Sequence, residues 1–259
     1  MRRISFFLIL IVTGANAQVR LSKLVIKAKE VYILKESDIL VADTLIMMDS
    51  SRLVMNKLKP ENYLRIRVGR FGKNCVIDAK GVSGQPGRNG VNGNTPTGPC
   101  MNGSAGKPGT RGLDGTNAIK LFLYIDRITI RGQLTIDVSG GDGGRGGHGG
   151  NGGGGSPGTT HCNGGNGSNG GLAGAGGNGG LGGAIQINVP KPQTFKDMIL
   201  AKKILVKVNG GAPGPSGKGG YHGGAGLGPG KRNGKDGEPG AYNKAGISGE
   251  KGSMVIQSK

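Results

Sequence analysis

The sequence predicts an all-β protein, a short β-solenoid of stacked coils with three glycine-rich excursions that form a six-helix polyglycine II bundle. Glycine supplies 57 of 259 residues and aromatic residues only 4%, which excludes an ordinary globular core along the whole chain. The glycine-rich tracts occupy residues 81–117, 140–183 and 210–252. Similar apolar segments precede each tract, and similar apolar segments follow it. The excursions therefore start and end at the same place in a repeating unit.

The segments that flank the tracts define that repeating unit. CVIDAKG (75–81), LTIDVSG (134–140) and LVKVNG (205–210) precede the tracts, while AIKL (118–121), AIQI (184–187) and MVIQ (254–257) follow them. Between the first two tracts lies one coil of roughly 22 residues, within the size range of stacked repeats. A single such coil cannot bury its apolar face alone, so the coils must stack and bring the three excursions into line.

Residues 18–80 are predicted to form a β-rich N-terminal cap of the solenoid. Short apolar runs at 24–26, 31–34, 44–47 and 52–55 are separated by polar turns. Residues 63–68 alternate strictly, which places Leu64, Ile66 and Val68 on a buried face and Arg65 and Arg67 outside. A short helix is possible at 195–201.

The excursions have a period of three residues, which is the period of polyproline II. In the first tract, five glycine triplets run out from Gly81 to Gly93 and five return from Gly103 to Gly115. The second tract has two glycines in most triplets, so we expect it to lie between the other two, with close neighbours on both sides. Turns are predicted at 94–97, 159–163 and 227–233. A collagen-like trimer is the alternative, because GQPG and GKPG are collagen-like sequences.

The first 17 residues are typical of a secretory signal peptide. Arg2 and Arg3 precede an apolar run over 4–12 and then Ala15-Asn16-Ala17, a small-residue cleavage site. We expect cleavage after Ala17, a secreted or cell-surface location and no membrane span. The domain division is therefore 1–17, 18–80 and 81–259.

The charge points to polyanionic partners. Removing Arg2 and Arg3 lowers the formal net charge from +19 to +17, which attracts polysaccharides and other polyanions outside the cell but is also a means of staying soluble. Export excludes intracellular nucleic acid. The candidate contacts are Arg65, Arg67, Arg70 and Lys73 on the strand face, and Lys231, Arg232 and Lys235 in the third excursion.

Three cysteines in an exported chain favour one disulfide and one remaining thiol. Cys100 and Cys162 each lie where the glycine rhythm breaks, so both should occupy loop tips at the same end and form a bridge. Cys75 lies in an apolar strand and is predicted to be a buried free thiol.

No pattern indicates an enzyme, a cofactor or a metal site. His148, His161 and His222 have no ligand-like spacing. Asp78 and Asp137 are equivalent in successive coils and could form the carboxylate pair of a solenoid carbohydrate-active enzyme. The stronger interpretation is that each aspartate caps a turn at the mouth of an excursion.

Runs such as GGRGGHGGN (143–151) and GGNGSNG (164–170) resemble the glycine-rich polyglycine II bundles of the snow-flea antifreeze protein and of T-even-like phage tip adhesins, and also bacterial collagen-like secreted proteins. The resemblance covers the excursions, under half of the chain. It implies exposed faces, which serve ice binding in one case and receptor recognition in the other. Here the outward positions are bulky or charged, unlike a flat ice-binding face: Arg88, Lys107, Arg111, Lys218, Tyr221, His222, Lys235, Asp236, Glu238 and Tyr242.

The sequence therefore predicts a monomeric, non-enzymatic, exported adhesive or structural protein whose polyglycine II bundle contacts cell-surface or matrix polyanions. An ice-binding protein, a solenoid carbohydrate-active enzyme and a collagen-like trimer are the alternatives.

Overall fold

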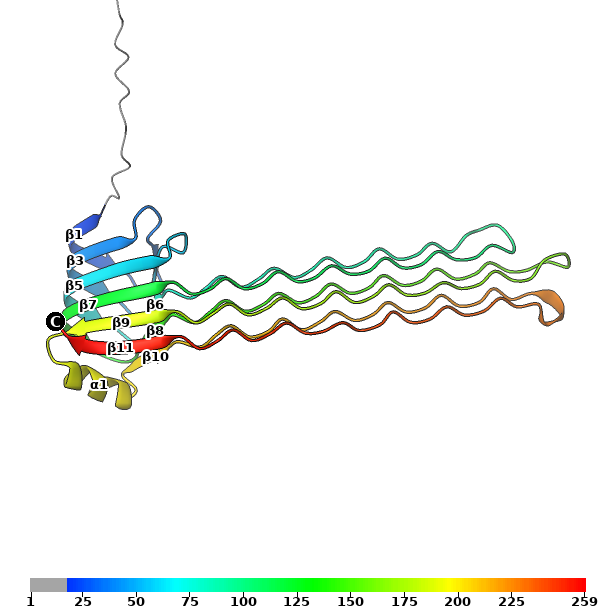
Figure 1. Ribbon diagram of the computed structural model, residues 1–259. Helices are drawn as coiled ribbons and strands as arrows, with labels where there is room; N and C mark the ends of the chain where they lie inside the picture. Colours follow the sequence, from blue (N-terminus) through cyan, green and yellow to red (C-terminus); the bar gives the residue numbers. More distant parts are fainter. Residues whose placement is uncertain (1–17) are drawn as a thin grey trace, which may run out of the picture.

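The computed structural model describes residues 18–259, so the predicted signal peptide lies outside the described residues. A short solenoid forms one end of the molecule and a long rod projects from it (Figure 1). The solenoid is built from two parallel sheets. In order, the larger sheet contains β1 (Val19–Ile26), β3 (Ile39–Met47), β5 (Glu61–Phe71), β7 (Lys120–Ile130), β9 (Ala184–Val189) and β11 (Ser253–Ser258). The smaller sheet contains β10 (Ile204–Lys207), β8 (Leu134–Asp137), β6 (Cys75–Asp78), β4 (Arg52–Val54) and β2 (Val31–Ile33).

Each coil contributes one strand to each sheet, so equivalent side chains stack on their own kind. Leu40, Leu64 and Leu123 follow one another across the larger sheet, and Ile77 pairs with Ile136 in the smaller one. These side chains are fully buried between the sheets. Burial of such ladders supplies the main stabilising term, because every coil covers the apolar face of the next. The strands of residues 18–80 belong to the same two sheets as the later coils.

The long strands turn a corner, and this corrects one prediction. Leu64 and Ile66 are buried, but Val68 is only half-buried, and Gly69 and Phe71 are the next inward residues. The change of parity falls beside Arg67, which has no register partner in the otherwise continuous pairing of β5 with β3. Strict alternation predicts one flat face, whereas closing a coil requires a bend that shifts the inward position by one residue.

A single α-helix, α1 (Pro192–Leu200), interrupts the β pattern within the described residues. It begins three residues before the predicted helix at 195–201, because Pro192 occupies the first turn, where its missing N–H has no role. Phe195 is buried and anchors α1 to the last coils. A short 3-10 turn, η1 (Pro229–Lys231), lies in the third excursion.

The rod consists of six extended arms within the described residues, as predicted. We name them by excursion and direction: 1a (81–94), 1b (103–117), 2a (140–156), 2b (164–183), 3a (210–227) and 3b (234–252). Arms 1a, 2a and 3a form one layer, in which Gly84 N–H donates to Asp142 O (2.7 Å) and Gly143 N–H to Ala212 O (2.8 Å).

Arms 1b, 2b and 3b form the other layer, and cross-layer bonds such as Gly144 N–H to Leu113 O (2.8 Å) join the two. The second excursion therefore lies between the first and third, as its glycine content predicts. Because polyproline II has no internal hydrogen bonds, these contacts replace the missing ones. All of them lie within one chain, so the neighbours that collagen takes from other chains are supplied here by the chain itself.

Candidate polyanion-binding surfaces

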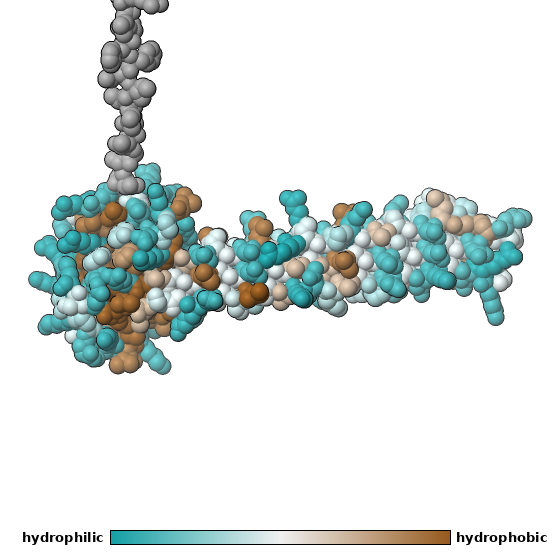
Figure 2. Space-filling view, viewed as in Figure 1, coloured by the Kyte–Doolittle hydropathy of each residue, from teal (hydrophilic) through white to brown (hydrophobic). Residues whose placement is uncertain are grey.

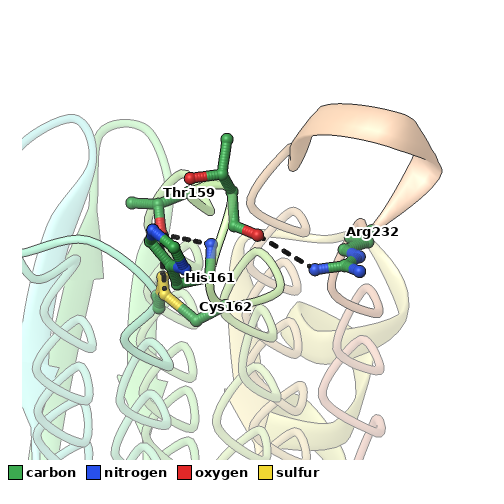
Figure 3. The surroundings of a disulfide bond; sticks show 6 residues. Thr159, His161, Cys162 and Arg232 are labelled. Atoms are coloured by element: carbon green, nitrogen blue, oxygen red, sulfur yellow. Dashed lines mark hydrogen bonds between the residues drawn. A yellow bond between two sulfur atoms is a disulfide. The ribbon is translucent and has the colours of Figure 1, made fainter.

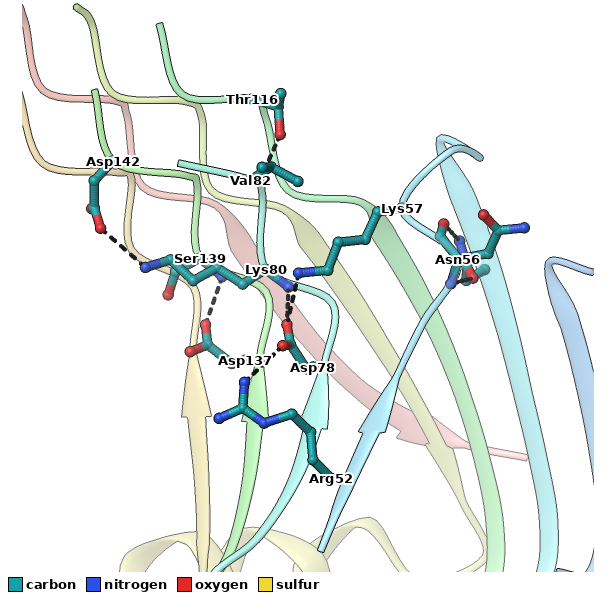
Figure 4. A network of polar contacts seen from close by, with 11 residues as sticks. Arg52, Asn56, Lys57, Asp78, Lys80, Val82, Thr116, Asp137, Ser139 and Asp142 are labelled. Carbon is teal, nitrogen blue, oxygen red and sulfur yellow. Dashed lines mark hydrogen bonds and ion pairs between the residues drawn. The ribbon is translucent and has the colours of Figure 1, made fainter. Parts of the chain in front are cut away.

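The junction between solenoid and rod is held by aspartates (Figure 4). Asp78 and Asp137 are register partners, and each caps its own turn: Asp78 Oδ1 accepts the N–H of Lys80 (3.0 Å) and Asp137 Oδ1 that of Ser139 (2.9 Å). Both capping roles confirm the prediction. Asp78 is buried and also forms ion pairs with Arg52 (3.1 Å) and Lys57 (3.4 Å). A carboxylate engaged in this way is a structural anchor.

Asp142 joins the three excursions next to this junction. Its Oδ1 accepts the N–H of Ala212 (2.9 Å) in arm 3a, and its Oδ2 accepts from Lys80 Nζ (3.2 Å), which directly precedes arm 1a. The backbone N–H of Ala212 and the ammonium of Lys80 hold the pKa of Asp142 below its ordinary value. Its charge is therefore committed to the bundle at neutral pH.

Further along the rod, side chains bond across each layer. Asn92 Oδ1 accepts the N–H of Asn151, and Asn151 Oδ1 accepts that of Tyr221, so one row connects all three arms of a layer. His148 takes the same place in the neighbouring row, where its Nδ1 accepts the N–H of Lys218 (2.8 Å). The glycine N–H groups of the arms bond to backbone carbonyls, whereas these rows bond the N–H groups of the outward, non-glycine residues. The rows were not predicted from the sequence.

The distal tip is closed by the predicted disulfide (Figure 3). Cys100 and Cys162 are bonded with their Cα atoms 6.0 Å apart, which joins the tips of the first and second excursions. Arg232 connects the third tip through an Nη1–H bond to Thr160 O (3.1 Å). Cys75 is a buried free thiol, as predicted, and its burial raises its pKa.

The predicted basic residues fall into two separate clusters. Arg65, Arg67 and Arg70 are exposed on the outer face of β5, and Lys73 is exposed in the turn after it. Lys231, Arg232 and Lys235 are exposed at the rod tip, at the opposite end of the molecule (Figure 1). The structure therefore does not bring the two clusters together.

The strand cluster is partly neutralised. Arg67 lies 3.9 Å from Asp43 on the neighbouring strand, whereas Arg65 stacks in register between Val41 and Tyr124. Arg70 lies beyond the corner and lines a groove of about 720 Å³. The same groove is lined by Arg131, Thr129 and Met48, which were not predicted. Arg131 could have been found because its turn is equivalent to Gly72-Lys73 in the preceding coil.

Two aromatic side chains beside this cluster, Tyr63 and Phe122, pack against each other. Tyr63 and Phe122 stack at 4.7 Å between ring centroids, nearly parallel, and Lys120 Nζ lies 4.6 Å from the Phe122 centroid. Lys120 binds Glu61 and the hydroxyl of Tyr63 donates to the same carboxylate, and these two contacts lower the pKa of Glu61. This group reinforces neighbouring strands, and because Arg67 pairs with Asp43, Arg65 and Arg70 are the arginines of the face that have no ion pair within residues 18–259.

Two findings concern the part of the chain from residue 18 onward. It contains no cluster of three His, Cys, Asp or Glu residues suited to a metal ion. Its helices are also too short or too polar to cross a bilayer.

Comparison with known proteins adds little. No protein-family model matches the chain, and no curated protein matches it. Among solved structures, the chain is similar to a springtail antifreeze protein from Granisotoma rainieri, a bundle of nine polyproline type II helices whose crystal waters match the ice lattice. The match has 27% identity, covers 63% of this chain and 93% of that chain, and has a TM-score of 0.12. A TM-score of this size carries no argument about fold or function.

Proposed function

We propose that the protein is a non-enzymatic, exported adhesive or structural protein that binds cell-surface or extracellular polyanions and displays its polyglycine II rod. The observation that carries the proposal is the exposed, incompletely neutralised arginine face of β5, which continues into the groove beside Arg70. Arginines bind carboxylate and sulfate groups in a bidentate manner, so they give more than diffuse attraction.

Two features favour adhesion over the alternatives. The rod surface is studded with protruding polar and apolar side chains (Figure 2), and Tyr221 and Tyr242 are 78% and 77% exposed, which does not suit a flat ice-binding face. Asp78 and Asp137, the carboxylates that an enzyme would need, are committed to backbone N–H groups. A catalytic role therefore has no free carboxylate pair on this ladder.

The test is retention of the purified protein on columns that carry carboxylated, sulfated or neutral polysaccharides. We expect retention on the anionic columns that persists in part at about 150 mM salt, where charge interactions over more than roughly 8 Å are largely screened, and none on the neutral column. Elution of all protein at low salt, or equal retention on the neutral column, would contradict the proposal. Measured thermal hysteresis or release of sugar from any column would favour an alternative.

A further inference from the structure

The solenoid end opposite the rod carries a row of stacked turns that we call the base turns, residues 27–30, 48–51, 72–74, 131–133 and 201–203. Their backbones bond from coil to coil: Lys29 N–H donates to Asp49 O (3.0 Å), Ser50 N–H to Lys73 O (2.7 Å) and Arg131 N–H to Phe71 O (2.9 Å). Neighbouring coils in such a stack are about 4.8 Å apart. The base turns therefore form a straight, closely spaced row.

Cations occupy most of this row. The exposed basic side chains in or beside it are Lys27, Lys29, Arg70, Lys73, Arg131, Lys202 and Lys203. Two acids lie among them, and both are engaged by backbone: Glu30 accepts the N–H of Lys27 (2.7 Å) and Asp49 Oδ1 accepts the N–H of Lys73 (2.8 Å). The balance along the row is thus positive at four of the five turns, and the turn at 48–51 carries Asp49 and no basic residue.

The groove of about 720 Å³ runs along the same row, because its lining comes from four successive turns, at Ala28, Asp49, Gly72 and Arg131. Gly72 lets two of these turns pack closely, since a Cβ there would overlap Asp49. Arg70 and Arg131 are the cationic residues of the groove lining, Asp49 is its one acidic residue, and Ile46 and Met48 add apolar surface. A ligand that fits must be linear, anionic at intervals and partly apolar between its charges.

We propose that the base groove binds a linear polysaccharide carrying carboxylate or sulfate groups, with its chain running along the coil stack. This rests on the proposed function and locates it at one end of the molecule. Bidentate arginine contacts suit carboxylate and sulfate, and the C–H faces of sugar rings suit Ile46 and Met48.

Single-stranded nucleic acid fits this groove less well than a polysaccharide does. Proteins that bind single strands stack the bases on exposed aromatic side chains. Phe71 is the aromatic residue of the groove lining, and it is only 2% exposed. The groove therefore offers cations to a backbone but no stacking surface to a base.

The experiment compares two doubly substituted proteins of equal net charge. Arg70→Gln with Arg131→Gln removes two base cations, and Lys231→Gln with Lys235→Gln removes two tip cations. Dissociation constants are measured at about 150 mM salt for polygalacturonate, dextran sulfate and single-stranded DNA, with circular dichroism to check folding. We expect at least tenfold weaker polysaccharide binding for the base variant, because it loses two charged hydrogen-bond donors, and less than about threefold for the tip variant.

The other outcomes separate the two proposals. Loss in the tip variant alone, or equal loss in both, would overturn the base groove while leaving polyanion binding intact. Tighter binding of single-stranded DNA than of either polysaccharide would overturn the ligand class. No binding of any probe by the unsubstituted protein would refute the proposed function itself. The two polysaccharide probes distinguish carboxylate from sulfate as the preferred group.

Discussion

At Gly147, in the middle arm 2a, the absence of a side chain is a packing requirement. A Cβ there would overlap the carbonyl oxygen of Arg88 in arm 1a, and that backbone is itself held by hydrogen bonds. Gly154 lies in the same arm near the tip, where the nearest atom to an added Cβ would be Gly224 O at 3.5 Å, an ordinary contact. Two glycines of one arm thus have different tolerances.

We therefore expect Gly147→Ala to destabilise the protein by about 3 kcal/mol or more, because overpacking must displace bonded backbone. Gly154→Ala should change stability by less than about 0.5 kcal/mol. Thermal unfolding of the two variants measures the difference. Equal melting temperatures would show that arms 1a and 2a are not in contact as described.

At the scale of the arms, side-chain acceptors and prolines follow one rule. Asp142, His148 and Asn151 accept from Ala212, Lys218 and Tyr221 of arm 3a. Arg145 lies between Asp142 and His148, and its side chain contains no hydrogen-bond acceptor atom. The residue that faces it in arm 3a by register is Pro215, which has no N–H. At these four positions between arms 2a and 3a, donor and acceptor are present together or absent together, which favours this register of the two arms.

This rule predicts different costs for two truncations in arm 2a. Asn151→Ala removes the acceptor for Tyr221 N–H and should cost about 1 kcal/mol, which lowers the melting temperature by roughly 2 to 4 °C in a chain of this size. Arg145→Ala removes no cross-arm bond and should leave the melting temperature within about 1 °C. A larger loss for Arg145→Ala than for Asn151→Ala would contradict the assigned register.

The arms could be predicted from the sequence because a glycine at every third position indicates where neighbouring arms touch. The disulfide could be predicted because Cys100 and Cys162 interrupt that period. Sequence reasoning could not reach the acceptor rows, since Asn92, Asn151 and Tyr221 are 59 and 70 residues apart and only the folded register aligns them. It also missed the corner near Val68 and the Arg131 side of the groove, because both depend on how a coil closes.

In the whole molecule, the solenoid sets the spacing of the excursions, and the rod separates the basic base turns from the basic tip. Strands β6, β8 and β10 lead into the rod, so the turns before them, which carry Lys73, Arg131 and Lys203, lie at the opposite end (Figure 1). A protein bound through these turns would hold its rod away from the surface. Binding through the tip would give a layer of the same thickness that the Arg70→Gln, Arg131→Gln substitutions leave intact, whereas binding along the rod would give a thin layer.

The thickness of the protein layer on a surface coated with carboxylated polysaccharide tests this account most directly, and neutron reflectivity measures it. The rod alone should be roughly 50 to 60 Å long at 3.1 Å per residue. Attachment through the base groove predicts a layer thicker than about 60 Å at low coverage, which collapses in the Arg70→Gln, Arg131→Gln protein as adsorption is lost. A layer only about 20 to 30 Å thick, the width of a few packed elements, would mean that the rod lies flat and would contradict the account.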